Sequence, residues 1–199
     1  MNVCETYDFI VIGGGSAGYA AARTANELGA KVAVVDDAEE LGGLCILRGC
    51  MPSKTLIYSS EILHFARQGK VFGFEHSRPR ADLALMQRRK KEIIAEFADY
   101  RTAQLKDGRF SLYRSKAKFV DQSSIEFTDG KTIKGDHFVL ATGSQIAMPP
   151  VPGLDQVSFK TSDEVLELTE VPNEVVVLGG GIVACELAQF LQRVGSKVT

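Results

Sequence analysis

Residues 8–18 read DFIVIGGGSAG, with glycines at Gly13, Gly14, Gly15 and Gly18. A short apolar run leads into these glycines, and small and apolar residues then continue to Leu28 and stop at Gly29. This pattern predicts a strand, a tight turn and a helix that ends at a glycine. A second apolar run at 32–35 ends at Asp36 and predicts the second strand of a β-α-β unit.

The unit has the context that a dinucleotide-binding fingerprint requires, because its glycines lie between a strand and a helix. Glycine permits the tight turn and a close backbone approach, and the amino end of the helix offers unpaired N–H groups to a pyrophosphate. Asp36 follows 23 residues after Gly13 and supplies a carboxylate for ribose hydroxyls. The candidate nucleotide-binding residues are Gly13, Gly15, Gly18 and Asp36. A glycine turn in an α/β fold that binds no nucleotide is the alternative.

The same pattern occurs a second time, 166 positions later. An apolar run at 175–178 enters a turn whose fingerprint positions are Gly179, Gly181 and Ala184. Alanine is acceptable at the third position, which governs the packing of helix against strand. The equivalent of Asp36 would be residue 202, beyond this sequence, so NAD and NADP both remain open as the second nucleotide.

Two cysteines, Cys45 and Cys50, follow the first unit with four residues between them. Pro52 predicts a helix start, and the helical pattern runs to about Ala66, which places Cys50 at or beside the amino end. The positive potential there favours a thiolate. A zinc site and a pair of unrelated buried thiols are the alternatives. His64, His76 and His137 show no ligand spacing with the cysteines, and Cys4 and Cys185 are assigned no role.

The remaining sequence predicts a helix over 81–106, whose basic run 88–91 reads as one solvated face. Alternating residues follow, with a hairpin at Asp129–Gly130 and a buried strand at 138–140. A proline-rich stretch at 149–153 is the best domain boundary, and a short helix is possible at 161–168.

Composition excludes several function classes. The 199 residues hold 25 acidic and 23 basic side chains and are 45% apolar, which is ordinary for a globular protein and predicts neither a nucleic-acid nor a membrane partner. The start of the chain has no leader pattern, so we expect a cytoplasmic protein. In that compartment four cysteines do not form a structural disulfide framework, which makes a close pair a redox candidate.

The segment CILRGCMPSK, residues 45–54, follows Gly42-Gly43 and closely resembles the redox-active segment of class I pyridine nucleotide-disulfide oxidoreductases. These flavoenzymes include dihydrolipoamide dehydrogenase, glutathione reductase and mercuric reductase. The first turn, the cysteine segment, the stretch 141–144 and the second turn occur in the family's order. The resemblance implies an α/β, Rossmann-like FAD/NAD(P)-binding three-layer fold with a β-meander insertion. Residues 1–150 would form the FAD-binding domain, and 151–199 the start of the NAD(P)-binding domain.

The resemblance also implies roles for individual residues. The positions that would lie near FAD are Gly13, Gly15, Gly18, Asp36, Gly43, Lys54, Ala117, Thr142 and Gly143. The nicotinamide nucleotide would be held by Gly179, Gly181 and Ala184. The catalytic residues would be Cys45, Cys50, Lys54 and Glu186. Cys50 would face the flavin, Cys45 would exchange with substrate, and Lys54 would pair with Glu186.

The implied reaction passes two electrons from NAD(P)H through FAD to a Cys45–Cys50 disulfide and then to a small-molecule or protein disulfide or dithiol. A dihydrolipoamide dehydrogenase-like activity is the first hypothesis. Arg48 departs from the usual lipoamide dehydrogenase segment and would favour an anionic or different substrate. The alternatives are a mercuric reductase-like enzyme, another flavoprotein reductase without disulfide chemistry, and a non-catalytic nucleotide-binding fragment.

Members of that family are longer than this chain and are expected to be homodimers. Their carboxy-terminal domain supplies a catalytic histidine base, which has no counterpart in residues 1–199. We therefore expect residues 1–199 alone to have little turnover and a reduced affinity for FAD.

Overall fold

The computed structural model describes residues 5–75 and 79–199, so Cys4 and His76 lie outside the described residues. The chain divides into two compact units. Unit 1 comprises residues 1–47 and 96–145, and unit 2 comprises residues 48–95 and 146–199. One boundary falls inside the long helix α4 (Leu83–Lys106). The division at residue 150 expected from sequence stays a prediction.

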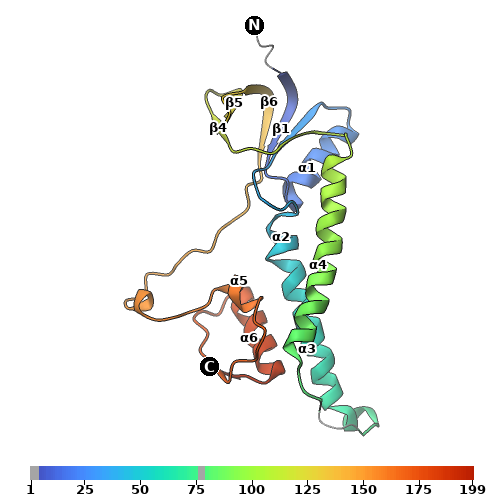
Figure 1. The fold of residues 1–199 in the computed structure, drawn as a ribbon, viewed down its shortest axis with the longest axis vertical. Helices are drawn as coiled ribbons and strands as arrows, with labels where there is room; N and C mark the ends of the chain where they lie inside the picture. Colours follow the sequence, from blue (N-terminus) through green and yellow to red (C-terminus); the bar gives the residue numbers. More distant parts are fainter. Residues whose placement is uncertain (1–4, 76–78) are drawn as a thin grey trace. The chain divides into compact units, whose positions relative to one another are not determined.

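Unit 1 is built on a six-stranded mixed sheet in the order β3-β2-β1-β6-β5-β4 (Figure 1). Its elements are β1 (Glu5–Ile12), α1 (Ser16–Glu27), β2 (Val32–Val35), α2 (Gly43–Leu47), β3 (Ser111–Tyr113), β4 (Ala117–Phe119), β5 (Ser124–Phe127) and β6 (Thr132–Leu140). Strands β3, β2, β1 and β6 pair in parallel, whereas β4, β5 and β6 form an antiparallel meander. The expected α/β fold with a β-meander insertion is confirmed.

The two faces of the parallel strands are covered by different layers. On one face, Val11 and Val34 pack with Tyr19 of α1 and with Leu105 near the end of α4. On the other face, Ile10, Ala33 and Val35 pack against residues of the meander, including Ile125 and Phe127. All four residues of β2 are buried, as expected for a parallel strand covered on both sides.

Strand β6 pairs with two different neighbours. Ser124 to Glu126 of β5 lie opposite its first residues in antiparallel register, and β1 runs parallel to it along most of its length. The predicted hairpin is confirmed, with Gly130 at a φ of 82° between the strands. The strand predicted at 138–140 is confirmed, but its expected burial is wrong, because Leu140 is 67% exposed. Beyond Lys134, β6 has a partner strand on one side only.

The start of β1 carries a polar cluster. Glu5 accepts hydrogen bonds from the hydroxyl groups of Tyr7 at 2.6 Å and Tyr113 at 2.9 Å, and from the Lys131 ammonium at 3.3 Å. These bonds, the one from Tyr7 first, lower the pKa of Glu5 to about 2. The cluster joins the beginning of β1 to the end of β3.

Unit 2 is a helical packing with a short strand pair. Its elements are α3 (Cys50–Arg67), the 3₁₀ helices η1 (Gly69–Phe72) and η2 (Leu154–Gln156), α5 (Ser162–Val165), β7 (Glu174–Val175), α6 (Ile182–Val194), β8 (Lys197–Val198) and the first part of α4. Leu56 of α3 and Phe190 of α6 are fully buried at the centre of its apolar cluster. The short helix predicted at 161–168 begins with a capping box between Thr161 and Glu164. Within the described residues, no helix is long and apolar enough to cross a membrane.

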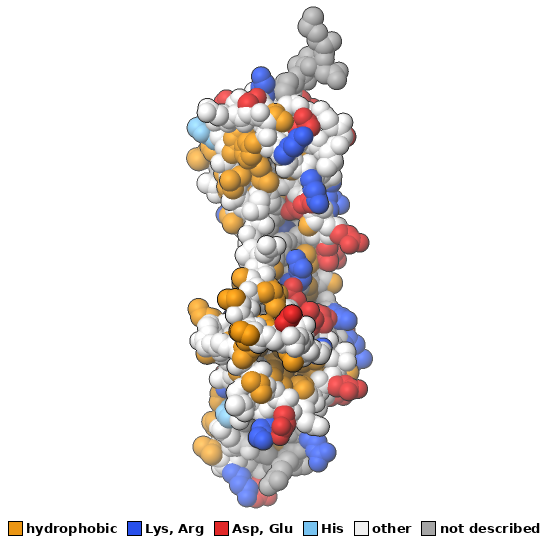
Figure 2. Space-filling view, turned by 90° about the vertical axis from the view of Figure 1, so that its left-hand side faces the viewer, with side chains coloured by type: hydrophobic (Ala, Val, Ile, Leu, Met, Phe, Trp, Pro, Cys, Tyr) orange, Lys and Arg blue, Asp and Glu red, His pale blue; other side chains and the backbone are white. Residues whose placement is uncertain are grey.

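The repeat seen in the sequence is confirmed in the structure. Helix α1 begins at Ser16 and α6 at Ile182, again 166 positions apart, and β7 pairs with β8 in parallel as β1 pairs with β2. The second copy covers its apolar residues poorly: Leu178 is 64% and Ile182 is 80% exposed. Hydrophobic side chains are accordingly gathered on the surface of unit 2 (Figure 2). A two-stranded parallel pair is too small to bury both of its faces.

The basic run of α4 is not the fully solvated face that its sequence predicts. Arg88, Arg89 and Lys91 are exposed, but Lys90 is only 2% exposed. Its ammonium donates to the Leu166 carbonyl at 2.6 Å and to a Glu167 carboxylate oxygen. These acceptors come from a segment 76 residues away, which the local charge pattern does not reveal.

Candidate nucleotide and redox site

The first glycine turn leaves backbone donors open at the amino end of α1. Gly13 has a φ of 101°, a conformation that favours glycine, and Gly15 is the residue that precedes the helix. No side chain caps this end, and the first turn of α1 contains no acidic residue. A helix end of this kind attracts an anion through its free N–H groups and its dipole.

Three glycines of this region sit where the backbone is crowded. A Cβ on Gly18 would lie 1.7 Å from the Gly13 carbonyl oxygen, and one on Gly13 would lie 2.2 Å from the Ala141 oxygen. A Cβ on Gly43 would lie 2.4 Å from the Gly15 Cα. The structure therefore brings Gly13, Gly15, Gly18 and Gly43 together at one place. Only glycine fits at positions 13, 18 and 43 without moving the backbone.

Asp36 lies at the same turn. The Gly14 N–H donates to its Oδ2 at 2.7 Å, and the Ala38 N–H donates to its Oδ1 at 2.9 Å. The Arg114 guanidinium lies 3.7 Å from Oδ1. The carboxylate is thus held at the end of β2 beside the glycine turn, where the sequence predicts a ribose-binding group.

Thr142 and Gly143 follow β6 at the same end of the sheet. The Ala141 N–H donates to the Ile12 carbonyl at 2.8 Å, which joins the exit of β6 to the exit of β1. Gly143 has a φ of 77°. These groups fit the ADP half of FAD. The glycines allow a close approach of the nucleotide, the uncapped start of α1 offers N–H groups to its pyrophosphate, and Asp36 offers a carboxylate to its ribose.

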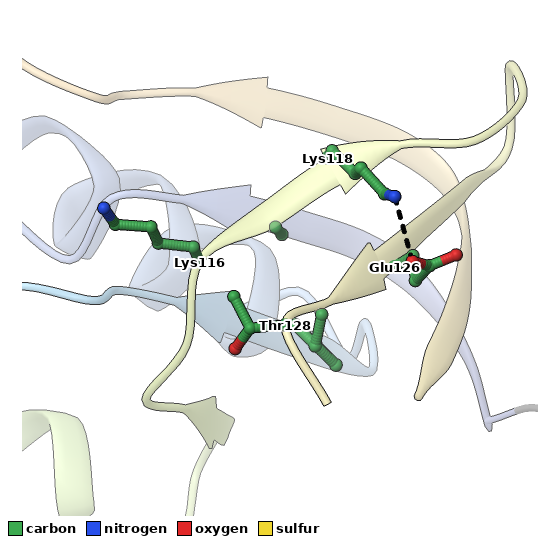
Figure 3. A pocket seen from close by; sticks show the side chains of 6 residues that line it. Lys116, Lys118, Glu126 and Thr128 are labelled. Atoms are coloured by element: carbon green, nitrogen blue, oxygen red, sulfur yellow. Dashed lines mark ion pairs between the residues drawn. The ribbon is translucent and has the colours of Figure 1, made fainter. Parts of the chain in front are cut away.

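Ala117 lies in a small pocket of its own between β4 and β5. The pocket has a volume of about 250 Å³ and is lined by Lys116, Ala117, Lys118, Glu126, Phe127 and Thr128 (Figure 3). An ion pair of 3.0 Å joins Lys118 to Glu126 across the two strands. The proximity of Ala117 to a flavin cofactor stays a prediction.

The two cysteines lie on consecutive helices. Cys45 is a half-buried free thiol within α2, and Cys50 is the exposed first residue of α3, as predicted from Pro52. Gly49 precedes α3 without any side-chain cap, and the first turn contains no acidic residue. The Ser53 hydroxyl donates to the Cys50 carbonyl at 3.2 Å. Because Cys50 is exposed, the alternative of two unrelated buried thiols is not supported.

Unit 2 contains the predicted pair of Lys54 and Glu186. The Lys54 ammonium donates to Glu186 Oε1, which joins the fifth residue of α3 to the fifth residue of α6. The pairing is confirmed, and its role beside a flavin stays a prediction. Arg48, between the cysteines, lies 3.7 Å from the Asp163 carboxylate and remains two-thirds exposed.

The second glycine turn is more open than the first. Gly179 has a φ of 111°, and a Cβ on Gly179, Gly180 or Gly181 would meet nothing within 4 Å. Gly181 precedes α6 without a side-chain cap. Ala184 stands where the first turn has Gly18. The geometry leaves room for a nucleotide, and the assignment of Gly179, Gly181 and Ala184 to one stays a prediction.

Sequence reasoning missed Arg101, which lies on α4 in unit 1. Its guanidinium carbon lies 4.1 Å from the centroid of the Tyr19 ring, one turn into α1. Burial lowers the pKa of Arg101, and the charges of Tyr19 and Cys45 act in the opposite direction. No signal in a single sequence connects residues 19, 45 and 101.

Among residues 5–75 and 79–199, no group of three His, Cys, Asp or Glu side chains is placed to hold a metal ion.

Comparison with known proteins gives relatives along nearly the whole chain. A mercuric reductase from Bacillus cereus is 38% identical over 97% of this chain and 30% of its own length. A dihydrolipoyl dehydrogenase from Bacillus subtilis is 34% identical over 97% of this chain and 43% of its own length.

A solved structure shows the same fold. The HOCl-induced flavoprotein disulfide reductase RclA from Escherichia coli, as its Cu(II) complex, superposes with a TM-score of 0.79 and 27% identity over 96% of this chain and 40% of its own. The chain thus spans less than half the length of these relatives. The model of the family described as pyridine nucleotide-disulphide oxidoreductase matches residues 7–199. The chain therefore belongs to the pyridine nucleotide-disulphide oxidoreductase family.

Proposed function

We propose that this chain is part of an FAD-dependent enzyme that passes two electrons between NAD(P)H and a disulfide or dithiol substrate through a Cys45–Cys50 redox disulfide. The observation that carries the proposal is the placement of the cysteines. Cys50 opens the uncapped helix α3, and Cys45 lies in the short helix that begins at Gly43 beside the first glycine turn. A thiol at a helix amino end gains stabilisation of its thiolate.

The first unit provides the binding groups for the flavin nucleotide. The N–H groups at the start of α1 would donate to the pyrophosphate, and Asp36 would accept ribose hydroxyls. Gly43, Ala117, Thr142 and Gly143 would border the cofactor. When bound, FAD supplies two-electron exchange between nicotinamide and the cysteine pair.

The cysteines divide the disulfide chemistry between them. The Cys45 thiolate would attack a substrate disulfide, which releases one substrate thiol and leaves a mixed disulfide on Cys45. Cys50 would then attack Cys45, which releases the second substrate thiol and closes the Cys45–Cys50 bond. Lys54, which is paired with Glu186 and follows Cys50 by four residues in α3, would place a positive charge one helical turn from Cys50.

The second glycine turn would hold NAD or NADP at Gly179, Gly181 and Ala184. Residues 1–150 would form the FAD-binding domain, and residues 151–199 the beginning of the nicotinamide domain. The complete enzyme would be a homodimer that acts on a small-molecule or protein substrate. Since residues 1–199 span less than half of the relatives, we expect turnover only from a longer protein.

The test uses the full-length, FAD-loaded protein. Anaerobic addition of NADH or NADPH, followed by rapid alkylation and mass spectrometry, measures how many of Cys45 and Cys50 become thiols. We expect both to open together on reduction and to close when a disulfide substrate is added. Replacing either cysteine with serine should abolish disulfide turnover, whereas Cys185→Ser should not. A flavin that is reduced and reoxidised by substrate without any change at the cysteines would disprove the proposal.

A second candidate substrate is Hg(II), because mercuric reductases from Bacillus cereus and Staphylococcus aureus are each 38% identical to this chain. Dihydrolipoyl dehydrogenase from Bacillus subtilis, at 34%, supports the lipoamide alternative. Two thiolates suit a soft metal ion as well as a disulfide. Steady-state NAD(P)H oxidation with Hg(II) and with lipoamide decides between them. The better substrate by kcat/KM identifies the activity, and the cysteine variants should lose it in either case.

A further inference from the structure

One cationic nitrogen of unit 1 is buried without a partner. Within the described residues, Nη1 of Arg101 is inaccessible to water and makes no hydrogen bond. Its neighbour Nε donates to Gln104 Oε1 at 3.3 Å, and the side chain as a whole is half-buried. A buried charged donor without an acceptor is costly, so its retention requires an explanation.

The surroundings of Arg101 connect it to the cysteine segment. Its guanidinium stacks on the Tyr19 ring, and the Tyr19 N–H donates to the Gly15 carbonyl at 2.8 Å. Gly15 in turn touches Gly43, which is the first residue of α2 and lies two positions before Cys45. Arg101 and Cys45 are close enough for their charges to interact. All of these residues belong to unit 1.

A second positive charge nearby does not take the same role. Arg23 on α1 also lies within electrostatic reach of Arg101, but its Nε is 3.5 Å from Glu27 on an exposed surface. Arg101 has no carboxylate partner among the described residues. No ion pair in the described part of the chain therefore offsets the charge that Arg101 exerts on its surroundings, which include Cys45.

We propose that Arg101 makes Cys45 selective for thiol and disulfide substrates that carry a negative charge, such as a carboxylate, close to the reacting sulfur. The inference rests on the proposed function, in which Cys45 is the thiol that exchanges with substrate. Tyr19 holds the guanidinium by cation–π contact, so the charge stays over the Tyr19 ring, within electrostatic reach of Cys45, rather than extending into solvent. Arg101 acts on specificity and is not required for the bond exchange itself.

The chemical step is ordinary thiol–disulfide exchange. Cys45 loses its proton to solvent and attacks one sulfur of the substrate. A bond forms between Cys45 and that sulfur, the substrate S–S bond breaks, and the second sulfur leaves as a thiolate. Negative charge spreads over three sulfurs during the exchange, and an anionic substrate adds its own charge. A fixed guanidinium favours both, and it favours the anionic substrate more.

The experiment compares two disulfide probes on Cys45 in the full-length, FAD-loaded protein carrying Cys50→Ser, which keeps Cys45 reduced. Dithiobis(nitrobenzoate) carries a carboxylate on each ring, and dithiodipyridine is neutral. Quenched samples are digested, and the fraction of modified Cys45 peptide gives a rate for each probe. Arg101→Gln should lower the ratio of anionic to neutral rates by about three- to tenfold, the size expected for one partly exposed unit charge.

Matched variants separate charge from structure. Arg101→Lys keeps the charge and should retain most of the ratio, while Arg89→Gln removes an exposed charge from the same helix and should leave it unchanged. Added salt should lower the ratio more in the parent protein than in Arg101→Gln, in which the exposed Arg48 remains. An equal ratio in parent and Arg101→Gln, or an equal slowing with both probes, would overturn the proposal. If Arg101→Gln does not fold, the ratio in Arg101→Lys and its salt dependence in the parent decide the question, and a ratio insensitive to salt overturns the proposal.

The result is independent of the proposed enzymatic cycle. Probe exchange at Cys45 needs no electron transfer from FAD. An equal ratio in parent and Arg101→Gln, together with a working redox cycle, refutes only the role of Arg101. A failed redox cycle, together with the expected fall of the ratio in Arg101→Gln, refutes only the proposed function.

Discussion

Gly18→Ala tests whether the crowding of the first turn is what allows it to bind a nucleotide. The new Cβ would lie 1.7 Å from the Gly13 oxygen and 3.1 Å from Val11 Cγ1. To reach the 3.0 Å that real Cβ atoms respect, the start of α1 must move by roughly 1.3 Å, since the Gly13 oxygen belongs to the backbone. Such overpacking costs about 1–3 kcal/mol, of which up to about 1 kcal/mol is returned by the better helix propensity of alanine.

The expected net loss is about 1–2 kcal/mol in the free energy of unfolding of the apoprotein. The helix N–H groups also leave their positions by about an ångström, so we expect the Kd for FAD to rise at least about tenfold, equivalent to about 1.4 kcal/mol. Urea denaturation followed by circular dichroism measures the first quantity. Titration with FAD, followed by quenching of its fluorescence, measures the second.

Gly180→Ala is the matched control, because a Cβ there meets nothing within 4 Å. It should change the free energy of unfolding by less than about 0.5 kcal/mol and leave FAD binding unaltered. If Gly18→Ala binds FAD as tightly as the parent and unfolds at the same urea concentration, the turn is not as crowded as the structure shows. The link from glycine to nucleotide binding would then be wrong.

Three other changes test separate parts of the fold. Lys90→Ala should destabilise the protein by about 1–3 kcal/mol in urea, because the buried Leu166 carbonyl loses one of its two side-chain donors and the buried Lys90 stem loses its packing, while the exposed Lys91→Ala should change little. Asp36→Ala should weaken FAD binding and lower stability by about 1–3 kcal/mol through two lost N–H bonds, measured by the same titration and denaturation. Glu5, whose pKa falls from 4.5 to about 2 on folding, should contribute stability above about pH 5 that disappears as the pH falls toward 2. Glu5→Gln should flatten that part of the profile of urea midpoint against pH, unlike Glu40→Gln, and parallel profiles for parent and Glu5→Gln would contradict the assignment.

The features that sequence predicted well are those set by neighbouring residues. The order of strand, glycine turn and helix at 8–28 follows from apolar runs and from the conformational freedom of Gly13. The position of Cys50 at a helix start follows from Pro52 two residues later. The repeat after 166 residues is visible in the sequence because both copies place glycines in the turn directly before the helix.

The sequence also located most of the candidate site, but not its contacts. It named Gly43 and Asp36 by position, and the structure adds that Gly43 touches Gly15 and that Asp36 accepts the Gly14 N–H. It paired Lys54 with Glu186 only through a family resemblance, because no local pattern joins residues 132 positions apart.

The sequence by itself determined the elements, the two nucleotide-type turns and the location of the cysteine pair, since these depend on backbone preference and on the spacing of apolar residues. Only the tertiary structure decided that Lys90 is buried, that Leu140 is exposed and that Arg101 lies over Tyr19, within electrostatic reach of Cys45. Burial and charge pairing depend on which distant segments meet. That choice is made by the packing of the whole chain rather than by the residues on either side.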